Sequence, residues 1–291
     1  MRRHKTSSRM PYIASPLEAV WMATDRTGKI CATAALASQV DGWLRILSGA
    51  HDDGLLSRMP DGAAIEPLTG VARHPFANVG CRLPTTKTNT VLYVSEYNTS
   101  YIRVPSVCHV APDARPRVKL FDMGCSVYGS RAHVRRASGH GPSLPLFEQW
   151  YESSCYAIDR MWGWEAKQMD AKKWWRRVSN ETRKKLTFNN HPVTPREFEA
   201  TLVRSTRPED YVVVKLDIDT PFAENEIIDL VEKHAHLVDE FFYEYHFWFD
   251  GLDFGWGKNA YRRLRTTHNV TTAVRRMQQL RKKGIRAHFW V

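Results

Sequence analysis

The sequence predicts an α/β fold built on an open, doubly wound and mostly parallel sheet. From residue 118 onward, short apolar runs alternate with amphipathic helical segments, which is the pattern of parallel βαβ units. Polar or acidic residues directly follow most of the apolar runs. A proline-rich stretch at 111–117 separates this region from an N-terminal extension of mixed helix and strand character. We therefore expect domains at 1–117 and 118–291.

The extension is predicted from weaker signals. Small and apolar residues at helical spacing indicate a helix over 29–47, and glycine and proline indicate loops over 54–84. Two β-rich runs over 89–107 indicate a hairpin. Such a hairpin is a candidate cover for an exposed edge of the sheet.

The elements after residue 117 follow from hydrophobic period and from end signals. Pro195 stands near the start of one helix, Ile227, Ile228 and Val231 share one helical face, and Gly284 closes the last helix. In chain order we expect strand 118–121, helix 146–161, strand 161–165, a basic helix 170–185, strand 186–190, helix 194–205, strand 211–219, helix 223–238, strand 240–247, helix 271–283 and strand 285–291.

Composition sets the classes of partner that are open. The 291 residues are 43% hydrophobic and 25% charged, which is typical of a globular chain. A net charge of +11 favours an anionic partner, and nucleic acid, a membrane surface or a small anionic ligand all fit. Clusters such as 172–177 carry the charge. They could contact phosphate and stack on bases, or form solvated helices with inward tryptophans.

Cysteine usage and the N-terminus bound the setting of the chain. The five cysteines are scattered without a C-x-x-C pair, so we expect neither a structural zinc site nor a disulfide scaffold. No apolar run approaches the roughly 18 residues of a spanning helix. The first ten residues are basic and lack acids, which is compatible with an organelle transit peptide or a disordered arm, and no secretory signal is seen. The compartment stays open.

The candidate site lies where the strands end. In open α/β sheets, ligands bind at the carboxyl ends of the strands, near the point where the strand order reverses. The polar residues found there are Asp122, Gly124, Ser126 and Gly129 after the first strand, Glu165 after the second, Asn189 and Asn190 after the third, Asp217 and Asp219 after the fourth, and Glu244 and His246 after the fifth.

Two of these strand ends suggest a nucleotide-like ligand. The turn 122–129 contains glycines and could expose amide donors, although it lacks the G-x-G-x-x-G and P-loop patterns. A tight strand-to-helix turn explains it equally well. Glu165 could accept both hydroxyls of a ribose, or it could be an exposed loop residue.

The order of these motifs resembles that of S-adenosylmethionine-dependent methyltransferases, specifically the FkbM-type family. "LFDMGCSVYG" is similar to the first glycine motif of that family, "MWGWEAKQMD" to its second strand and "FNNHPV" to its third. "VVVKLDID", "EFFYEYH" and "QLRKKGIRAHFWV" resemble the later strands and the closing helix. The resemblance covers residues 118–291 and implies a Rossmann-like methyltransferase sheet.

The resemblance also implies a chemistry. S-adenosylmethionine would be the cofactor, Glu165 its ribose ligand, and a hydroxyl of a sugar, a glycan or another small molecule the methyl acceptor. Transfer needs alignment of acceptor and methyl and a base for the hydroxyl proton. The catalytic candidates are Asp217, Asp219 and His246, with Asp219 first. The cofactor-binding candidates are Asp122, Gly124, Ser126, Gly129, Glu165 and Asn189.

Three departures from the family pattern keep other interpretations open. The glycine turn is one residue longer than usual, "TPFAE" replaces the Glu-Gly after the fourth strand so that Glu224 is not placed, and only one strand follows the fifth. The first alternative is a catalytically inactive methyltransferase-like subunit of a larger assembly, which could contain RNA.

A second alternative reads the aspartates as metal ligands. Asp217, Asp219 and His246 would then hold Mn²⁺ in a D-x-D glycosyltransferase. A third interpretation concerns Lys215, which strand alternation places on the same face as both aspartates. Lys215 would then pair with a carboxylate in a local ion cluster.

Overall fold

The computed structural model describes residues 10–16, 18–19, 56–68, 99, 102–129, 142–245 and 270–290. The chain divides into two compact units. The first holds 1–7 and Val104–Phe242, and the second holds Ser8–Arg103 and Tyr243–Val291. No helix among the described residues is long and apolar enough to cross a membrane.

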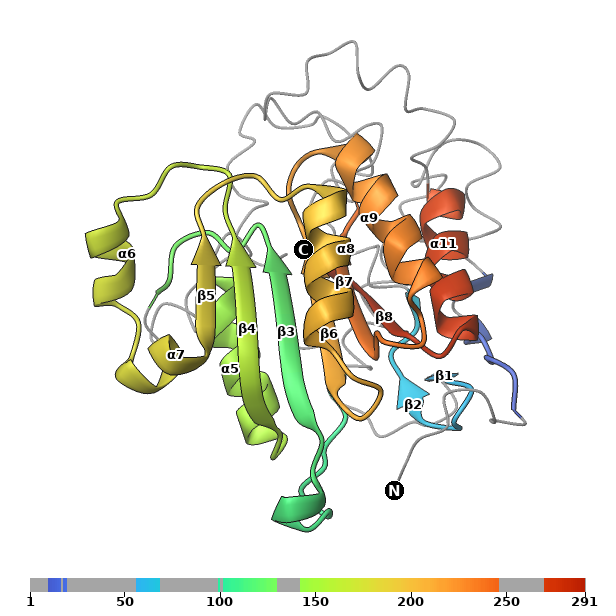
Figure 1. The fold of residues 1–291 in the computed structure, drawn as a ribbon. Coiled ribbons are helices and arrows are strands. Elements are labelled where there is room, and N and C mark those ends of the chain that lie inside the picture. The colour runs from blue at the N-terminus through green and yellow to red at the C-terminus, as the bar shows by residue number, and fades with distance from the viewer. Residues whose placement is uncertain are drawn as a thin grey trace, which may run out of the picture. The chain divides into compact units, whose positions relative to one another are not determined.

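The strands and helices follow the predicted alternation (Figure 1). These elements are divided between the two units, and the division falls within β7. The elements up to β7 are η5 (Pro112–Ala114), β3 (Arg117–Met123), α5 (Ser143–Ser153), β4 (Ala157–Trp164), α6 (Ala171–Arg176), α7 (Asn180–Lys185), β5 (Leu186–Asn189), α8 (Pro195–Ser205), β6 (Tyr211–Leu216), α9 (Pro221–Lys233) and β7 (Glu240–Glu244). The second unit also holds β1 (Ser57–Arg58), β2 (Ala64–Ile65), α11 (Val270–Lys282) and β8 (Arg286–Trp290).

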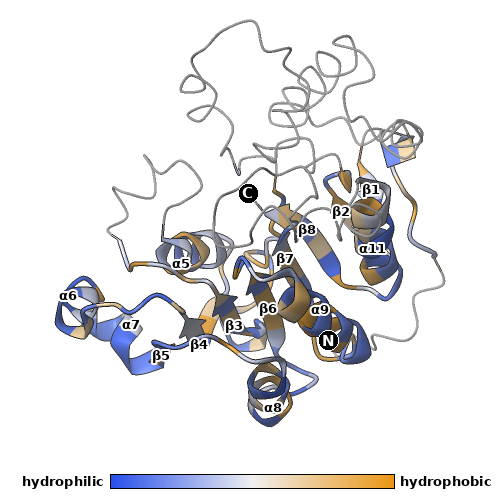
Figure 2. Cartoon of the chain, turned by 90° about the horizontal axis from the view of Figure 1, so that it is seen from above, coloured by the Kyte–Doolittle hydropathy of each residue, from blue (hydrophilic) through white to orange (hydrophobic). Residues whose placement is uncertain are grey.

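The main sheet has the strand order β5-β4-β3-β6-β7-β8. β3 pairs in parallel with both β4 and β6, and β4 pairs in parallel with β5. Counted from β3, this is the order 3-2-1-4-5-6 of doubly wound nucleotide-binding folds. Figure 2 shows α5 on one face of the sheet and α8 on the other. The predicted α/β class with a parallel, Rossmann-like sheet is confirmed.

Burial explains why β6 is an apolar run with a single charged residue, Lys215. All six residues of β6 are buried, as expected of a central strand covered on both faces. Beside it, Phe121 of β3 stacks on Trp162 of β4 at 4.7 Å and meets Phe198 of α8 edge-on at 6.1 Å. The centre of the sheet is thus fixed by large side chains on neighbouring elements.

Two helix predictions need correction. The helix expected over 146–161 ends at Ser153, and β4 begins at Ala157. Between them Cys155 has φ +66°, a left-handed conformation that stops a helix. The helix expected over 170–185 is two short helices, because the Ser179 side chain accepts from Thr182 N and caps α7 as a new helix.

The extension lies largely outside the described residues. The helix predicted over 29–47 falls there, and so does the first arm of the hairpin predicted over 89–107. Residues 102–107 are described and contain no strand, so the second arm of that hairpin is wrong.

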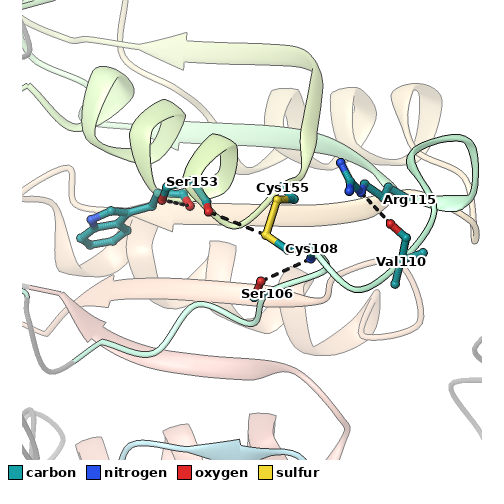
Figure 3. The surroundings of a disulfide bond; sticks show 7 residues. Ser106, Cys108, Val110, Arg115, Ser153 and Cys155 are labelled. Atoms are coloured by element: carbon teal, nitrogen blue, oxygen red, sulfur yellow. Dashed lines mark hydrogen bonds between the residues drawn. A yellow bond between two sulfur atoms is a disulfide. The ribbon is translucent and has the colours of Figure 1, made fainter.

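A disulfide corrects the expectation drawn from the cysteines. Cys108 and Cys155 are bonded, with Cα atoms 4.9 Å apart (Figure 3). The bond joins the segment before η5 to the turn between α5 and β4, and the amide of Val107 donates to Ser154 O at 3.0 Å beside it. Scattered spacing concealed the pair because the partners are 47 residues apart. Cys125 is free and buried.

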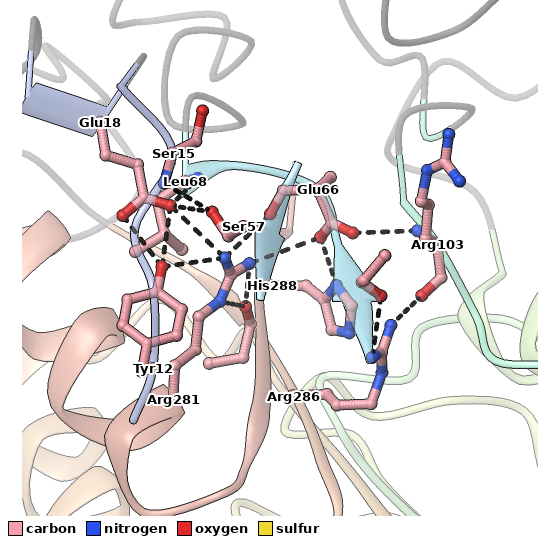
Figure 4. A network of polar contacts seen from close by, with 12 residues as sticks. Tyr12, Ser15, Glu18, Ser57, Glu66, Leu68, Arg103, Arg281, Arg286 and His288 are labelled. Atoms are coloured by element: carbon pink, nitrogen blue, oxygen red, sulfur yellow. Dashed lines mark hydrogen bonds and ion pairs between the residues drawn. The ribbon is translucent and has the colours of Figure 1, made fainter. Parts of the chain in front are cut away.

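A buried ion network holds the second unit together (Figure 4). Arg281 of α11 donates to Glu66 O at 2.8 Å and lies 3.6 Å from Glu18. His288 of β8 contacts the Glu66 carboxylate, and Tyr12 donates to Glu18 at 2.8 Å. Residues from both ends of the chain, which belong to the same compact unit, therefore share one core.

Candidate functional site

The carboxyl ends of four parallel strands meet at one edge of the first unit. Met123 lies opposite Trp164 in β4 and opposite Leu216 in β6, and Trp164 lies opposite Asn189 in β5. Because the strands end in register, the residues that follow them share this edge. The order reverses between β3 and β6, which is where ligands bind in such sheets. The structure therefore gathers the strand ends as the sequence predicted.

The glycine turn after β3 is shaped by β6. Gly124 has φ +84°, and a Cβ placed on it would lie 1.6 Å from the Asp217 carbonyl oxygen. Asp217 N in turn donates to Met123 O at 3.1 Å. At Gly129 a Cβ would lie 2.5 Å from Pro142 Cγ. Both glycines are thus required by close packing of the chain around the turn.

Glu165 is bound to that turn. Its Oε2 accepts from Ser126 N at 2.9 Å, and its Oε1 accepts from Lys167 N at 2.8 Å. Ser126 adopts φ +55°, and its carbonyl accepts from Trp174 Nε1 at 3.1 Å. The turn after β3, the end of β4 and helix α6 therefore form one connected structure.

The asparagines at the end of β5 have different roles. Asn190 Nδ2 donates to Glu165 O at 3.0 Å and to Lys167 O at 2.7 Å, while its Oδ1 accepts from Met169 N at 2.8 Å. Asn190 thereby fixes the loop that carries Glu165. Asn189 is half-buried at the strand end, and its carbonyl accepts from Glu165 N at 3.1 Å.

Lys215 lies in an ion cluster beneath the turn. Its Nζ is 2.9 Å from Asp217 Oδ2, 3.4 Å from Asp122 Oδ1 and 2.7 Å from Gly124 O, where it donates a hydrogen bond. Asp122 is fully buried and also accepts from Ser143 Oγ at 2.6 Å. Burial raises the pKa of Asp122, and the charge of Lys215 opposes that rise. The ion cluster expected at Lys215 is present.

Two further carboxyls follow β6. Asp219 is exposed and has φ +52°; partial desolvation of its carboxyl, together with the nearby charge of Asp217, raises its pKa to about 6. Glu224, in the first turn of α9, is fully buried and accepts from Ile218 N at 3.0 Å. Burial raises the pKa of Glu224 to about 8. A carboxyl that titrates near neutrality can accept a proton from a substrate.

Some predicted site residues remain unplaced. His246, which was both a catalytic and a metal-ligand candidate, lies outside the described residues. β7 neighbours β6 in the sheet and ends at Glu244.

Three residues of the site were not predicted from the sequence. Ser143 carries no motif that signals its bond to Asp122. Trp174 was seen only as part of a basic run, although it is buried and donates to the glycine turn. Glu224 does not fit the family pattern, and no local sequence signal indicates that it is buried near Asp217 and Asp219.

Comparison with known proteins adds no family. No protein-family model, no curated protein and no solved structure matches the chain. The class is therefore defined by architecture alone: an α/β protein with a Rossmann-like sheet and an acidic strand-end edge at its switch point.

Proposed function

We propose that this protein is an S-adenosylmethionine-dependent methyltransferase that acts on the hydroxyl of a sugar or another small acceptor. The observation that carries the proposal is the hydrogen bond from Ser126 N to Glu165. It joins a glycine turn to an acid at the end of the neighbouring strand, beside the switch point. Nucleotide-binding sheets use these two features together, with the acid accepting from ribose hydroxyls.

Glu165 keeps capacity for such a ligand. Each carboxylate oxygen has about two acceptor positions. One position on each oxygen is used by the amides of Ser126 and Lys167, so a ribose diol can be accepted as well. The cofactor, when bound, supplies an electrophilic methyl group on a sulfonium sulfur.

Asp219 is the base in this proposal. Its pKa of about 6 leaves it ionised at neutral pH yet basic enough to accept a hydroxyl proton. Asp217 is paired with Lys215 at 2.9 Å, so its charge is compensated and it serves to position the turn. Asp219 would accept the proton of the acceptor hydroxyl, while the acceptor oxygen would displace the neutral thioether S-adenosylhomocysteine from the methyl carbon.

Calorimetry with S-adenosylhomocysteine tests the proposal. We expect the wild-type chain to bind it and Glu165→Gln to bind about tenfold more weakly, the loss of one charged hydrogen bond. Glu181→Gln, at an exposed glutamate that pairs with Lys184, is the matched control and should bind like wild type. Binding of NAD in place of S-adenosylhomocysteine would overturn the choice of cofactor.

A catalytically inactive structural subunit is the second candidate. It is favoured by the ion cluster, in which the charge of Lys215 compensates Asp122 and Asp217 without a ligand. Its signature is a folded chain whose melting temperature does not move at about 1 mM S-adenosylhomocysteine, a concentration that stabilises any protein with micromolar affinity. Tight binding of a UDP-sugar that requires Mn²⁺ would instead favour the glycosyltransferase alternative.

A further inference from the structure

Helices α6 and α7 present a concentrated positive charge. Residues 170–185 contain seven lysines and arginines against two acids. Lys185 is largely buried and pairs with Glu148 at 3.1 Å. The other six are exposed, and we call them the basic surface: Lys172, Lys173, Arg176, Arg177, Arg183 and Lys184.

The inward side of α6 is fixed by Trp174. Its ring is buried and stacks on Phe188 of β5 at 3.8 Å, with the planes 13° apart. Its Nε1 donates to Ser126 O at 3.1 Å. Since successive residues of a helix turn by about 100°, Lys172 and Arg176 point directly away from Trp174. The stacked tryptophan therefore determines that these charges face outward.

The charge arrangement serves the helix only in part: Lys173 and Arg176 lie in the last turn of α6, where cations favour the helix dipole, but the spacing of the charges opposes it. Lys172 and Arg176 are four apart, and so are Lys173 and Arg177, a spacing at which like charges destabilise a helix. Among the described residues, no ion pair joins Lys172, Arg176 or Arg177 to an acid. Lys173 remains 75% exposed beside Asp170. Destabilisation of a helix by like charges is expected where an anionic partner neutralises the surface.

The two helices form one surface. Arg183 of α7 donates through Nε to Val178 O at 3.1 Å, and its guanidinium also donates to Trp175 O. Arg183 is thereby held against the end of α6. Trp175 is half-buried, and its ring meets Trp174 edge-on at 5.0 Å. The basic surface thus has an aromatic side chain at its margin.

We infer that the basic surface binds single-stranded nucleic acid. Its cations would follow the phosphates, and the partly exposed Trp175 ring would offer a face on which a base can stack, the combination that single-strand binders use. A sulfated polysaccharide would also meet the cations, but it has no aromatic face for Trp175. The inference is independent of the proposed methyl transfer.

Fluorescence anisotropy tests the inference. The full chain is titrated into a labelled oligouridylate of roughly 12 nucleotides, a length within the usual range of single-strand sites. The variant is Lys172→Glu/Arg176→Glu. Its control is Arg196→Glu/Arg204→Glu, which makes the same charge change at exposed arginines of α8. We expect the variant to bind at least about tenfold more weakly at physiological salt and to lose about 1.4 from the salt slope, near 0.7 per phosphate contact. The control should bind within about twofold of wild type.

Equal losses in the variant and the control would mean that net charge alone attracts the oligonucleotide, and the inference would fail. A second variant tests the base contact: Trp175→Leu should weaken oligouridylate about fivefold or more, as loss of one stacked base does, and leave binding of a sulfated polysaccharide unchanged. Unchanged oligouridylate binding by Trp175→Leu, with the polysaccharide bound more tightly, would assign the basic surface to polysaccharide. Melting temperatures of all variants establish that they are folded.

Discussion

A Cβ on Gly124 would lie 1.6 Å from the carbonyl oxygen of Asp217, so the turn after β3 and the end of β6 are in direct backbone contact. Neither atom can move easily, because Asp217 N also donates to Met123 O. The two strand ends at the switch point therefore depend on a glycine.

We predict that Gly124→Ala is strongly destabilised. The clash forces the backbone of β6 to shift, in addition to the strain of a positive φ, and we expect a loss of about 3 kcal/mol or more in the free energy of unfolding. Gly62→Ala is the control, because Gly62 has φ +79° but nothing within 4 Å of the added Cβ. It should lose only about 1 kcal/mol. Urea denaturation measures both, and equal losses would contradict the contact with Asp217.

We predict that Lys215→Met unfolds far more easily than a matched lysine variant. It leaves the fully buried Asp122 without its cation, which typically costs about 3–5 kcal/mol, and Lys215→Met/Asp122→Asn should recover part of the loss. Lys119→Met is the control, since Lys119 and its partner Asp159 are 13% and 34% exposed, and a pair that water reaches contributes far less than a fully buried one, about 1 kcal/mol. Denaturant midpoints compare the three variants, and no recovery in the double variant would argue against the pair.

Glu224 should make stability fall as pH rises. Burial, followed by the charges of Asp217 and Asp219, raises its pKa from 4.5 to about 8. Between these pH values the folded chain holds a proton that the unfolded chain releases, so the free energy of unfolding decreases with pH. Glu224→Gln keeps an acceptor for Ile218 N and removes this slope. Urea unfolding across this pH range measures the difference from wild type, with Glu226→Gln, at an exposed position of α9, as control. A wild-type slope equal to that of Glu224→Gln would show that Glu224 does not titrate there.

The disulfide should contribute substantially to stability. For a loop of 47 residues, the chain-entropy model gives about 4 kcal/mol, with smaller values common. Cys108→Ser and Cys155→Ser should each lose this contribution, and the double variant should lose no more than either single one. Reductant should lower the melting temperature of wild type but leave the double variant unchanged. A reductant effect on the double variant would point to another cause.

Much of the first unit could be predicted, because its signals are local. The run Tyr211–Leu216 is apolar except for Lys215, since β6 is buried along its whole length. Pro195 marks the start of α8, whose Thr194 side chain accepts from Glu197 N. Where prediction failed, a single residue decided the outcome. The left-handed conformation of Cys155 prevents α5 from continuing as predicted, and Ser179 caps a new helix within a basic run.

By itself, the sequence determined the α/β alternation and the set of polar residues at the strand ends, because hydrophobic period and strand termini are local properties of the chain. The tertiary structure decided what each polar residue contacts. The partner of Glu165 is 39 residues away, that of Cys108 is 47 away, and that of His288 is 222 away. Such contacts depend on how separate elements pack, so only the folded chain reveals that Asp122 and Ser143 join the cluster around Lys215 and that the two ends of the chain share one core.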